Sequence, residues 1–293
     1  MPSLKDIRRR ITSVRKTQQI TRAMRMVAGA KLRRAQGAIE SARPYADRMQ
    51  ATLAEVARSQ RDAEHPLLTA RPEVTRAEFL VVTSDRGLCG AFNANVLKHA
   101  DPLIAARRTR GQQVTVSTAG RKAREHYRRR LPAQLGADYP QTGWVRYGQA
   151  VDIAARLASR YASGEIDEAI LVFSQFASAM TQRPKHVRLL PFAPAGGGEG
   201  GEGGEAAETL PYQIEPSAEK LLAVLVPKAL EVEIYRALLE NQAGEHGARM
   251  TAMESATRNT TELIQSLVLQ FNRARQAAIT KELVEIVSGA EAL

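Results

Sequence analysis

The sequence contains one cysteine, Cys89, in 293 residues. It can therefore form no intramolecular disulfide and no cysteine-based metal cluster, and this usage suits a reducing compartment. Long apolar runs are also missing. The longest, such as LLAVLV at 221–226, are far too short to span a bilayer, and no apolar signal core lies near Met1. These absences argue against a disulfide-stapled secreted domain and against membrane-spanning helices.

Residues that carry chemistry are equally scarce. The five histidines lie far apart, have no metal-ligand spacing, and are more typical of surface or capping positions: His65, His99, His126, His186 and His246. The loop TSDRGLCGAFN at 83–93 could present backbone N–H groups to a phosphate. Its glycines, however, match neither of the nucleotide-binding motifs G-x-G-x-x-G and G-x-x-x-x-G-K-S/T. Cys89 has no apparent base beside it, so a buried structural thiol is expected. We therefore expect no catalytic residue, no metal and no cofactor, which counts against a nucleotide-dependent enzyme.

Acidic residues are few where basic ones are many. The formal net charge is +11, and residues 1–34 hold eleven Lys and Arg against one acid, Asp6. A basic helix face predicts an acidic partner, which can be nucleic acid, anionic lipid or an acidic protein surface. A basic coiled-coil nucleic-acid-binding protein is thus an alternative, although residues 1–44 contain no aromatic side chain for base stacking.

The first 56 residues carry apolar or small side chains at alternating three- and four-residue spacing, interrupted only by Gln18, Thr21 and Arg25. This heptad pattern predicts a coiled-coil helix over 1–58, roughly 84 Å long for 56 residues. Its members are Leu4, Ile7, Ile11, Val14, Ala28, Leu32, Ala35, Ile39, Ala42, Ala46, Met49, Leu53 and Val56.

The same spacing returns over 217–288, so a second coiled-coil helix is expected there. Pro227 should bend this helix or end a turn near it, and Gly244 and Gly247 should weaken it by roughly 1 kcal/mol each relative to alanine. The two terminal helices are expected to pair antiparallel within one chain; a homodimeric coiled coil is the other arrangement that the pattern allows.

Between these helices, residues 75–192 predict an α/β domain. Short strands rich in Val, Ile and Phe (78–84, 112–119 and 168–176) alternate with helical stretches (90–107, 121–130 and 148–163), and 185–192 suggests an edge strand. This alternation indicates a Rossmann-like, doubly wound sheet that is mostly parallel. The Gly- and Glu-rich stretch within 193–210 is expected to be a flexible insert with no assigned function.

Three stretches together resemble the gamma subunit of bacterial F-type ATP synthases. They are LKDIRRRITSVRKTQQITRAMRMVAGAKLRRAQ (4–36), SDRGLCGAFN (84–93) and FNRARQAAITKELVEIVSGA (271–290), and ARMTAMESATRNTTELI (248–264) belongs to the same resemblance. The resemblance covers effectively the whole chain. The 195–208 insert has no match in it, and the cysteine pair of some redox-regulated members is absent.

The resemblance implies a non-catalytic central rotor. In that family an antiparallel coiled coil enters the hexamer of alpha and beta subunits, and the α/β domain packs beside the epsilon subunit above the c-subunit ring. Proton-driven rotation of that ring then changes the catalytic sites of the beta subunits. The family is peripheral, at the cytoplasmic face of the bacterial inner membrane, and binds no nucleic acid.

The resemblance also assigns contact residues. It places Met24 near an acidic lever of a beta subunit, Arg275 and Gln276 against a beta-subunit loop, and Tyr212 and Glu215 in the foot on the c ring and epsilon subunit. We further expect the polar seam residues Gln18, Thr21 and Arg25 to lie where the C-terminal helix runs on alone.

Overall fold

The computed structural model describes residues 3–59, 65–192 and 217–291. The chain forms two compact units, one built from two segments at opposite ends of the sequence and the other from the single continuous segment between them. We call Met1–Ala30 with Arg249–Leu293 the helix-pair unit, and Lys31–Ala248 the α/β unit. Tyr212, Glu215 and the glycine-rich insert lie outside the described residues.

Helix α1 (Leu4–Ser59) begins at a side-chain cap and follows the predicted range closely. Ser3 accepts a hydrogen bond from the backbone N–H of Asp6 at 3.2 Å and donates one to the Asp6 carboxylate at 2.7 Å. A serine followed three residues later by an acid stabilises a helix start. The serine hydroxyl accepts a hydrogen bond from a first-turn N–H, and the carboxylate interacts favourably with the positive end of the helix dipole. The predicted stripe is confirmed as the buried face: nine of its apolar members, Ile7, Ile11, Ala28, Leu32, Ala35, Ile39, Ala46, Leu53 and Val56, are buried.

Helix α5 (Ala218–Glu291) is also continuous, and the expectation that Pro227 would end a turn is wrong. The backbone N–H of Lys220 donates to the Ser217 hydroxyl at 3.4 Å, so the helix starts well before the proline. Proline removes the hydrogen bond to the carbonyl four residues earlier, here that of Ala223. Ala223 is exposed, so water can satisfy this carbonyl and the helix continues.

The α/β unit contains a five-stranded sheet in the order β3-β2-β1-β4-β5. The four strands β1 (Arg76–Val82), β2 (Gln113–Ala119), β3 (Leu135–Tyr139) and β4 (Glu168–Phe176) are parallel, and β5 (Gln182–Leu190) pairs antiparallel with β4. The doubly wound, mostly parallel sheet is confirmed, and so is the edge strand. Sequence reasoning missed β3 because its five residues are only half-buried and lack the Val- and Ile-rich run of a central strand.

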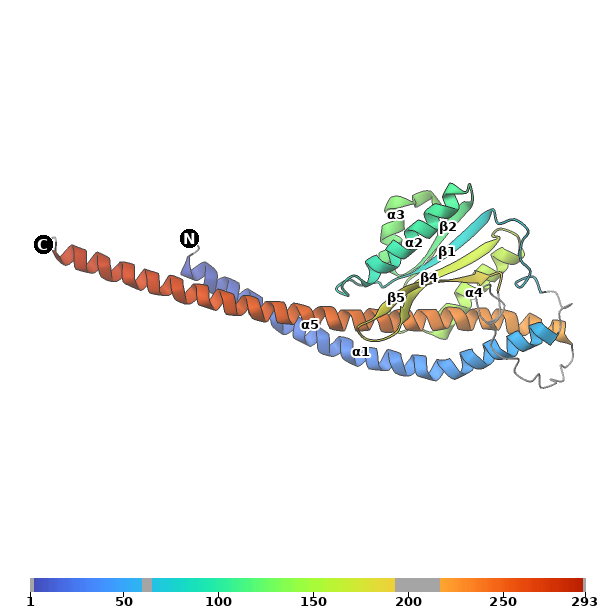
Figure 1. The fold of residues 1–293 in the computed structure, drawn as a ribbon, viewed down its shortest axis with the longest axis horizontal. Coiled ribbons are helices and arrows are strands. Elements are labelled where there is room, and N and C mark those ends of the chain that lie inside the picture. Colours follow the sequence, from blue (N-terminus) through green and yellow to red (C-terminus); the bar gives the residue numbers. More distant parts are fainter. Residues whose placement is uncertain (1–2, 60–64, 193–216, 292–293) are drawn as a thin grey trace. The chain divides into compact units, whose positions relative to one another are not determined.

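Helices cover both faces of this sheet (Figure 1). Helices α2 (Phe92–Thr109) and α3 (Arg121–Arg130) lie on one face, where Phe79 and Val81 of β1 meet Val96 and Tyr127. Helix α4 (Tyr147–Ala162) lies on the other, where a second core also includes parts of α1 and α5. Alternate residues of β1 therefore serve two separate cores, as expected for a sheet buried on both sides.

Helix α5 is buried on nearly every side between Ala229 and Gly247. A β-carbon added to Gly244 would lie 3.0 Å from the ring of Phe92, and one added to Gly247 would lie 3.0 Å from the carbonyl oxygen of Ala179. The sequence suggested that the two glycines are weak points of the helix, but both lie where the helix is packed against other elements. They let the helix backbone approach the start of α2 and the β4–β5 turn, which a larger side chain would prevent.

Buried charges tie the start of the sheet together. Asp167 accepts hydrogen bonds from the backbone N–H groups of Thr75 and Arg76 at 3.0 and 2.9 Å, and from the Arg76 guanidinium at 2.8 Å. Burial works to raise the pKa of Asp167, but the hydrogen bonds from Arg76 and Thr75 prevail and hold that pKa below its ordinary value. Glu78, with 1% of its surface exposed, pairs with Arg160 of α4 and accepts a hydrogen bond from Ser117 at 2.5 Å.

We predict that Arg160→Leu destabilises the α/β unit by about 3–5 kcal/mol, because it leaves the carboxylate of Glu78 buried without a cation. The measurement is urea unfolding followed by circular dichroism. Arg121→Ala is the matched control: Arg121 pairs with Glu125 at 3.4 Å on the surface, and its loss should cost about 1 kcal/mol or less. Equal stabilities of the two variants would contradict a structural role for the Glu78–Arg160 pair.

Candidate partner-binding surface of the helix-pair unit

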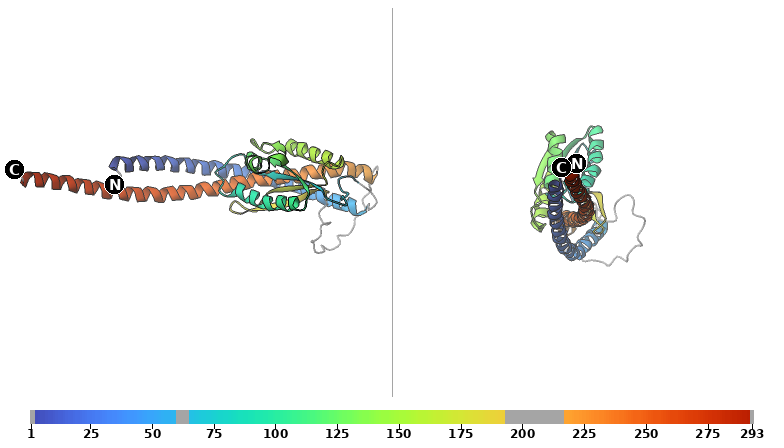
Figure 2. Two further views of the ribbon diagram at one scale, coloured as in Figure 1. Left: turned by 90° about the horizontal axis from the view of Figure 1, so that it is seen from above. Right: turned by 90° about the vertical axis from the view of Figure 1, so that its left-hand side faces the viewer.

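In the helix-pair unit, α1 and α5 run antiparallel and side by side (Figures 1 and 2). At one level Ile7 and Ile11 pack with Leu267 in a small apolar core. Further along, a β-carbon on Gly29 would lie 3.4 Å from the Met250 sulfur, so small seam residues allow close packing. The expected pairing of the terminal helices within one chain is confirmed.

Between these apolar levels the seam is polar, and each polar residue has a partner on the other helix. Gln18 donates to the Thr261 hydroxyl at 2.7 Å, the hydroxyls of Thr21 and Thr257 lie 2.8 Å apart, and Arg25 pairs with Glu254 at 3.5 Å. Thr21 is only 8% exposed. Since these contacts between the helices form in one alignment only, this layer favours one register of the two helices.

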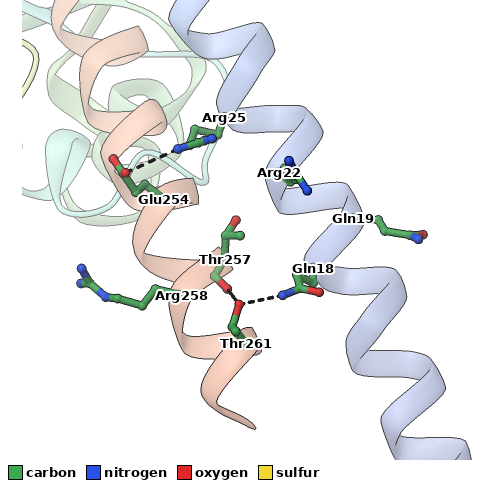
Figure 3. Close-up of a pocket in the computed structure, with 8 residues that line it drawn as sticks. All are labelled: Gln18, Gln19, Arg22, Arg25, Glu254, Thr257, Arg258 and Thr261. Atoms are coloured by element: carbon green, nitrogen blue, oxygen red, sulfur yellow. Dashed lines mark hydrogen bonds and ion pairs between the residues drawn. The ribbon is translucent and has the colours of Figure 1, made fainter. Parts of the chain in front are cut away.

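A surface groove of about 430 Å³ lies alongside this layer and is lined by both helices (Figure 3). Figure 3 shows Gln18 and Arg25 reaching across to α5, whereas Arg258 points away from α1. The lining carries three arginines, Arg22, Arg25 and Arg258, against one carboxylate, that of Glu254. The groove therefore favours acidic groups, but its cations do not converge on one point.

The basic surface that the sequence predicted is present on α1. Of the eleven Lys and Arg in residues 1–34, Arg25 is half-buried and the other ten are exposed. A second surface groove of about 450 Å³ near the start of α1 is lined by four cations, Lys5, Arg8, Arg9 and Lys16, together with Thr12 and Ser13. This part of the molecule is positively charged and accessible, as a surface for an acidic partner must be.

Large apolar side chains are also exposed on the same unit. They include Ile20, Met26 and Val27 on α1, and Leu269, Ile279, Leu283, Val284, Ile286 and Val287 on α5. Helix α5 continues past the start of α1 (Figure 1), and the last five of these residues lie on that unaccompanied end. Extended apolar surface of this kind is typical of an interaction site. Sequence reasoning concentrated on the heptad frame and missed these residues. The available signal was the close spacing of Leu283, Val284 and Ile286, which a single apolar stripe does not explain.

The sequence-predicted contact residues occupy two separate levels of the unit. Met24 is half-buried near the Arg25–Glu254 pair, while Arg275 and Gln276 are exposed where α1 begins. About twenty helical residues separate these levels, which corresponds to roughly 30 Å. The expectation that Gln18, Thr21 and Arg25 face the unaccompanied end of α5 is wrong, because they lie well inside the paired region.

The loop at 83–93 of the α/β unit is structural in its local contacts. The side chains of Thr83 and Asp85 accept hydrogen bonds from the backbone N–H groups of Ala123 and Arg121 at 2.9 and 2.8 Å. The loop therefore satisfies first-turn donors of α3, although the helix that it leads into is α2. Cys89 is buried, as expected, and accepts from Asn93 at 3.3 Å.

Within the described ranges, no three His, Cys, Asp or Glu side chains gather as metal ligands. In the same part of the chain, no helix combines the length and apolar character that crossing a bilayer requires.

Comparison with known proteins gives a consistent result. A family model described as ATP synthase matches residues 3–293. The ATP synthase gamma chains of Heliobacterium modesticaldum and Desulforamulus reducens are each 48% identical over the full length of both chains. Two solved structures are similar in fold. A chain of the Euglena gracilis mitochondrial ATP synthase has a TM-score of 0.67 at 19% identity, with 99% of this chain and 94% of that one covered. A chain of the Tetrahymena thermophila central stalk and c ring has a TM-score of 0.61 at 23% identity, with 81% and 99% covered.

The polar layer generates a prediction about pairing. Thr21→Val alone should destabilise the helix-pair unit by about 0.5–1.5 kcal/mol, because the hydroxyl of Thr257 loses its partner on the other helix and keeps only the carbonyl oxygen of Met253 at 2.7 Å. Replacing both residues by valine should recover most of that loss but weaken the preference for one register. Thermal unfolding of the single and double variants measures the first effect, and cysteine cross-linking at seam positions measures the second. Additive losses in the double variant would show that the two hydroxyls are not coupled.

Proposed function

This chain belongs to the ATP synthase gamma family and is a non-catalytic rotor-shaft subunit of that enzyme. We propose that its helix-pair unit transmits torque through weak contacts with the alpha and beta subunits. The observation that carries the proposal is the pairing of α1 and α5 under a surface both basic and apolar. A partner that encloses this unit would cover the apolar residues and meet the cations with acidic groups.

The proposed mechanism is mechanical. The catalytic sites of the enzyme are on the beta subunits, and the shaft acts on them by presenting different sides in turn. Exposed ion pairs contribute only about 0–1 kcal/mol each, so contacts between shaft cations and beta-subunit acids can form and break without halting rotation. The paired helices resist twisting better than one helix would, because their seam is packed and its register is selected by the Thr21–Thr257 level.

We assign the family contacts to specific residues. Met24 faces the acidic lever of a beta subunit, and Arg275 with Gln276 meets a beta-subunit loop at a separate level. Support comes from the exposure of Arg275 and Gln276 on α5 and from the basic groove that Arg22 and Arg25, on the same part of α1 as Met24, help to line. Tyr212 and Glu215 form the foot on the c ring and the epsilon subunit. The assembly is peripheral at the cytoplasmic face of the inner membrane, where proton flow through the c ring turns the shaft.

The nucleic-acid alternative has no observation in its favour. The basic surface of α1 is interleaved with exposed aliphatic residues such as Ile20, Met26 and Val27, which do not stack on bases. Co-expression with the family's alpha and beta subunits tests the main proposal. We expect one copy of the chain in each alpha–beta hexamer, together with ATP hydrolysis that the hexamer couples to rotation. Failure to co-purify with the hexamer would overturn the assignment.

We predict that Met24→Lys impairs coupling more than assembly. A lysine beside carboxylates, partly shielded from water, adds an attraction above the surface value of about 1 kcal/mol, and each rotational step must break it. ATP hydrolysis should persist, while ATP-driven proton pumping falls and its temperature dependence steepens. Both activities are measured in membranes that carry the complex.

Met24→Leu is the matched neutral control, because it keeps the side-chain size without the charge. If Met24→Lys and Met24→Leu give equal ratios of pumping to hydrolysis, then Met24 does not face the acidic levers. Substitutions at Arg275 or Gln276 should partly compensate for Met24→Lys if both levels contact the beta subunits during the same rotational step.

A further inference from the structure

Two histidines that are 87 positions apart in the sequence meet in the α/β unit. His99 lies on α2 and His186 on β5. The Nε2 atom of His99 is 3.0 Å from the Nδ1 atom of His186, with ring centroids 5.2 Å apart and ring planes inclined by 37°. Sequence reasoning treated the histidines singly, because no local spacing connects a helix to an edge strand formed much later in the chain.

The fold explains why these rings meet. His186 pairs in register with Val172 of β4, whose side chain is buried in the core beneath α2 and α3. His186 therefore projects from the sheet edge toward α2, where the buried residues Val96 and Ala100 hold the helix against the sheet. His186 is exposed and His99 half-buried, so a small ion can reach both rings from solvent.

We propose that His99 and His186 form a binding site for a divalent transition-metal ion of the Zn²⁺, Ni²⁺ and Cu²⁺ class. These ions bind imidazole well, whereas Mg²⁺ and Ca²⁺ prefer oxygen ligands. With Zn–N distances of about 2.0–2.1 Å, two nitrogens on one tetrahedral ion lie about 3.4 Å apart, so the two nitrogens must separate by about 0.4 Å and both rings must tilt until their lone pairs point at the ion. Because no third protein ligand is present among the described residues, water completes the coordination shell.

The protonation state suits this role. Burial lowers the pKa of His99, and the nearby His186 lowers it further, a direction that favours the neutral ring. Only neutral imidazole binds a metal, and the adjacent rings cannot both be protonated without repulsion. The two ring nitrogens now share one hydrogen bond at 3.0 Å, which an ion can replace with two coordinate bonds.

The consequence of binding is a cross-link between α2 and β5. The strand β5 has one neighbour in the sheet, β4, and its first seven residues are exposed or half-buried. It is therefore the least supported strand on that side. A ligand that binds only the folded arrangement stabilises it by mass action.

The experiment uses the full chain, stripped with chelator and then titrated with ZnCl₂. Thermal unfolding by circular dichroism should shift upward by a few degrees at about 1 mM Zn²⁺. MgCl₂ at the same concentration should have no effect. Equilibrium dialysis should give one Zn²⁺ per chain at saturation.

His99→Gln and His186→Gln should each abolish the zinc-dependent shift and weaken binding at least tenfold. His65→Gln, which alters a histidine outside the pair, should retain both. Far-UV circular dichroism like that of the unaltered chain establishes that the variants fold. The proposal is overturned if Zn²⁺ neither binds nor shifts unfolding, or if the shift and the binding persist in His99→Gln or His186→Gln.

Discussion

The antiparallel contact between α1 and α5 is the constraint on which the rest of this molecule depends. The two helices come from opposite ends of the chain, so every other described element is inserted between segments that must meet. A contact between such distant segments carries a high loop-closure cost, which grows only slowly with the length of what is inserted. The folded sheet lowers that cost, because its own core includes the ends of the helices nearest to it: Leu53 and Val56 of α1 share a cluster with Leu222 and Val226 of α5.

Helix α5 shows how one element can meet two different packing demands. In the helix-pair unit it buries a narrow seam, and most of its surface is exposed. In the α/β unit the stretch between Ala229 and Gly247 is buried on nearly all sides, because a sheet and another helix both contact it. A heptad pattern describes the first environment well. It is insufficient for the second, where Leu230, Ile234 and Leu238 are buried although they lie outside the heptad frame of Leu222, Leu225, Ala229 and Val232.

This difference explains how far the sequence could predict the structure. The long helices, three parallel strands and the edge strand were predictable, because each has a regular apolar period or a Val- and Ile-rich run. The role of Gly244 was not, because its reason lies in the ring of Phe92, a residue 152 positions earlier. The same holds for the partners of Gln18 and Thr21. Periodicity marked them as polar interruptions, but only the observed register places Thr261 and Thr257 opposite them.

The polar level of the seam accounts for a property that a rotating shaft needs. A seam of apolar side chains alone can slide by one heptad and still bury similar surface, so a twisting load could change its register. At the Thr21–Thr257 level such a slip would separate two hydroxyls that lie 2.8 Å apart, and each would keep only the carbonyl oxygen of its own helix. The cost of the polar level is a smaller apolar seam. In exchange, the polar level keeps the helices in one alignment when they carry torque. The strong interactions then lie inside the shaft, and the weak ones lie on its surface.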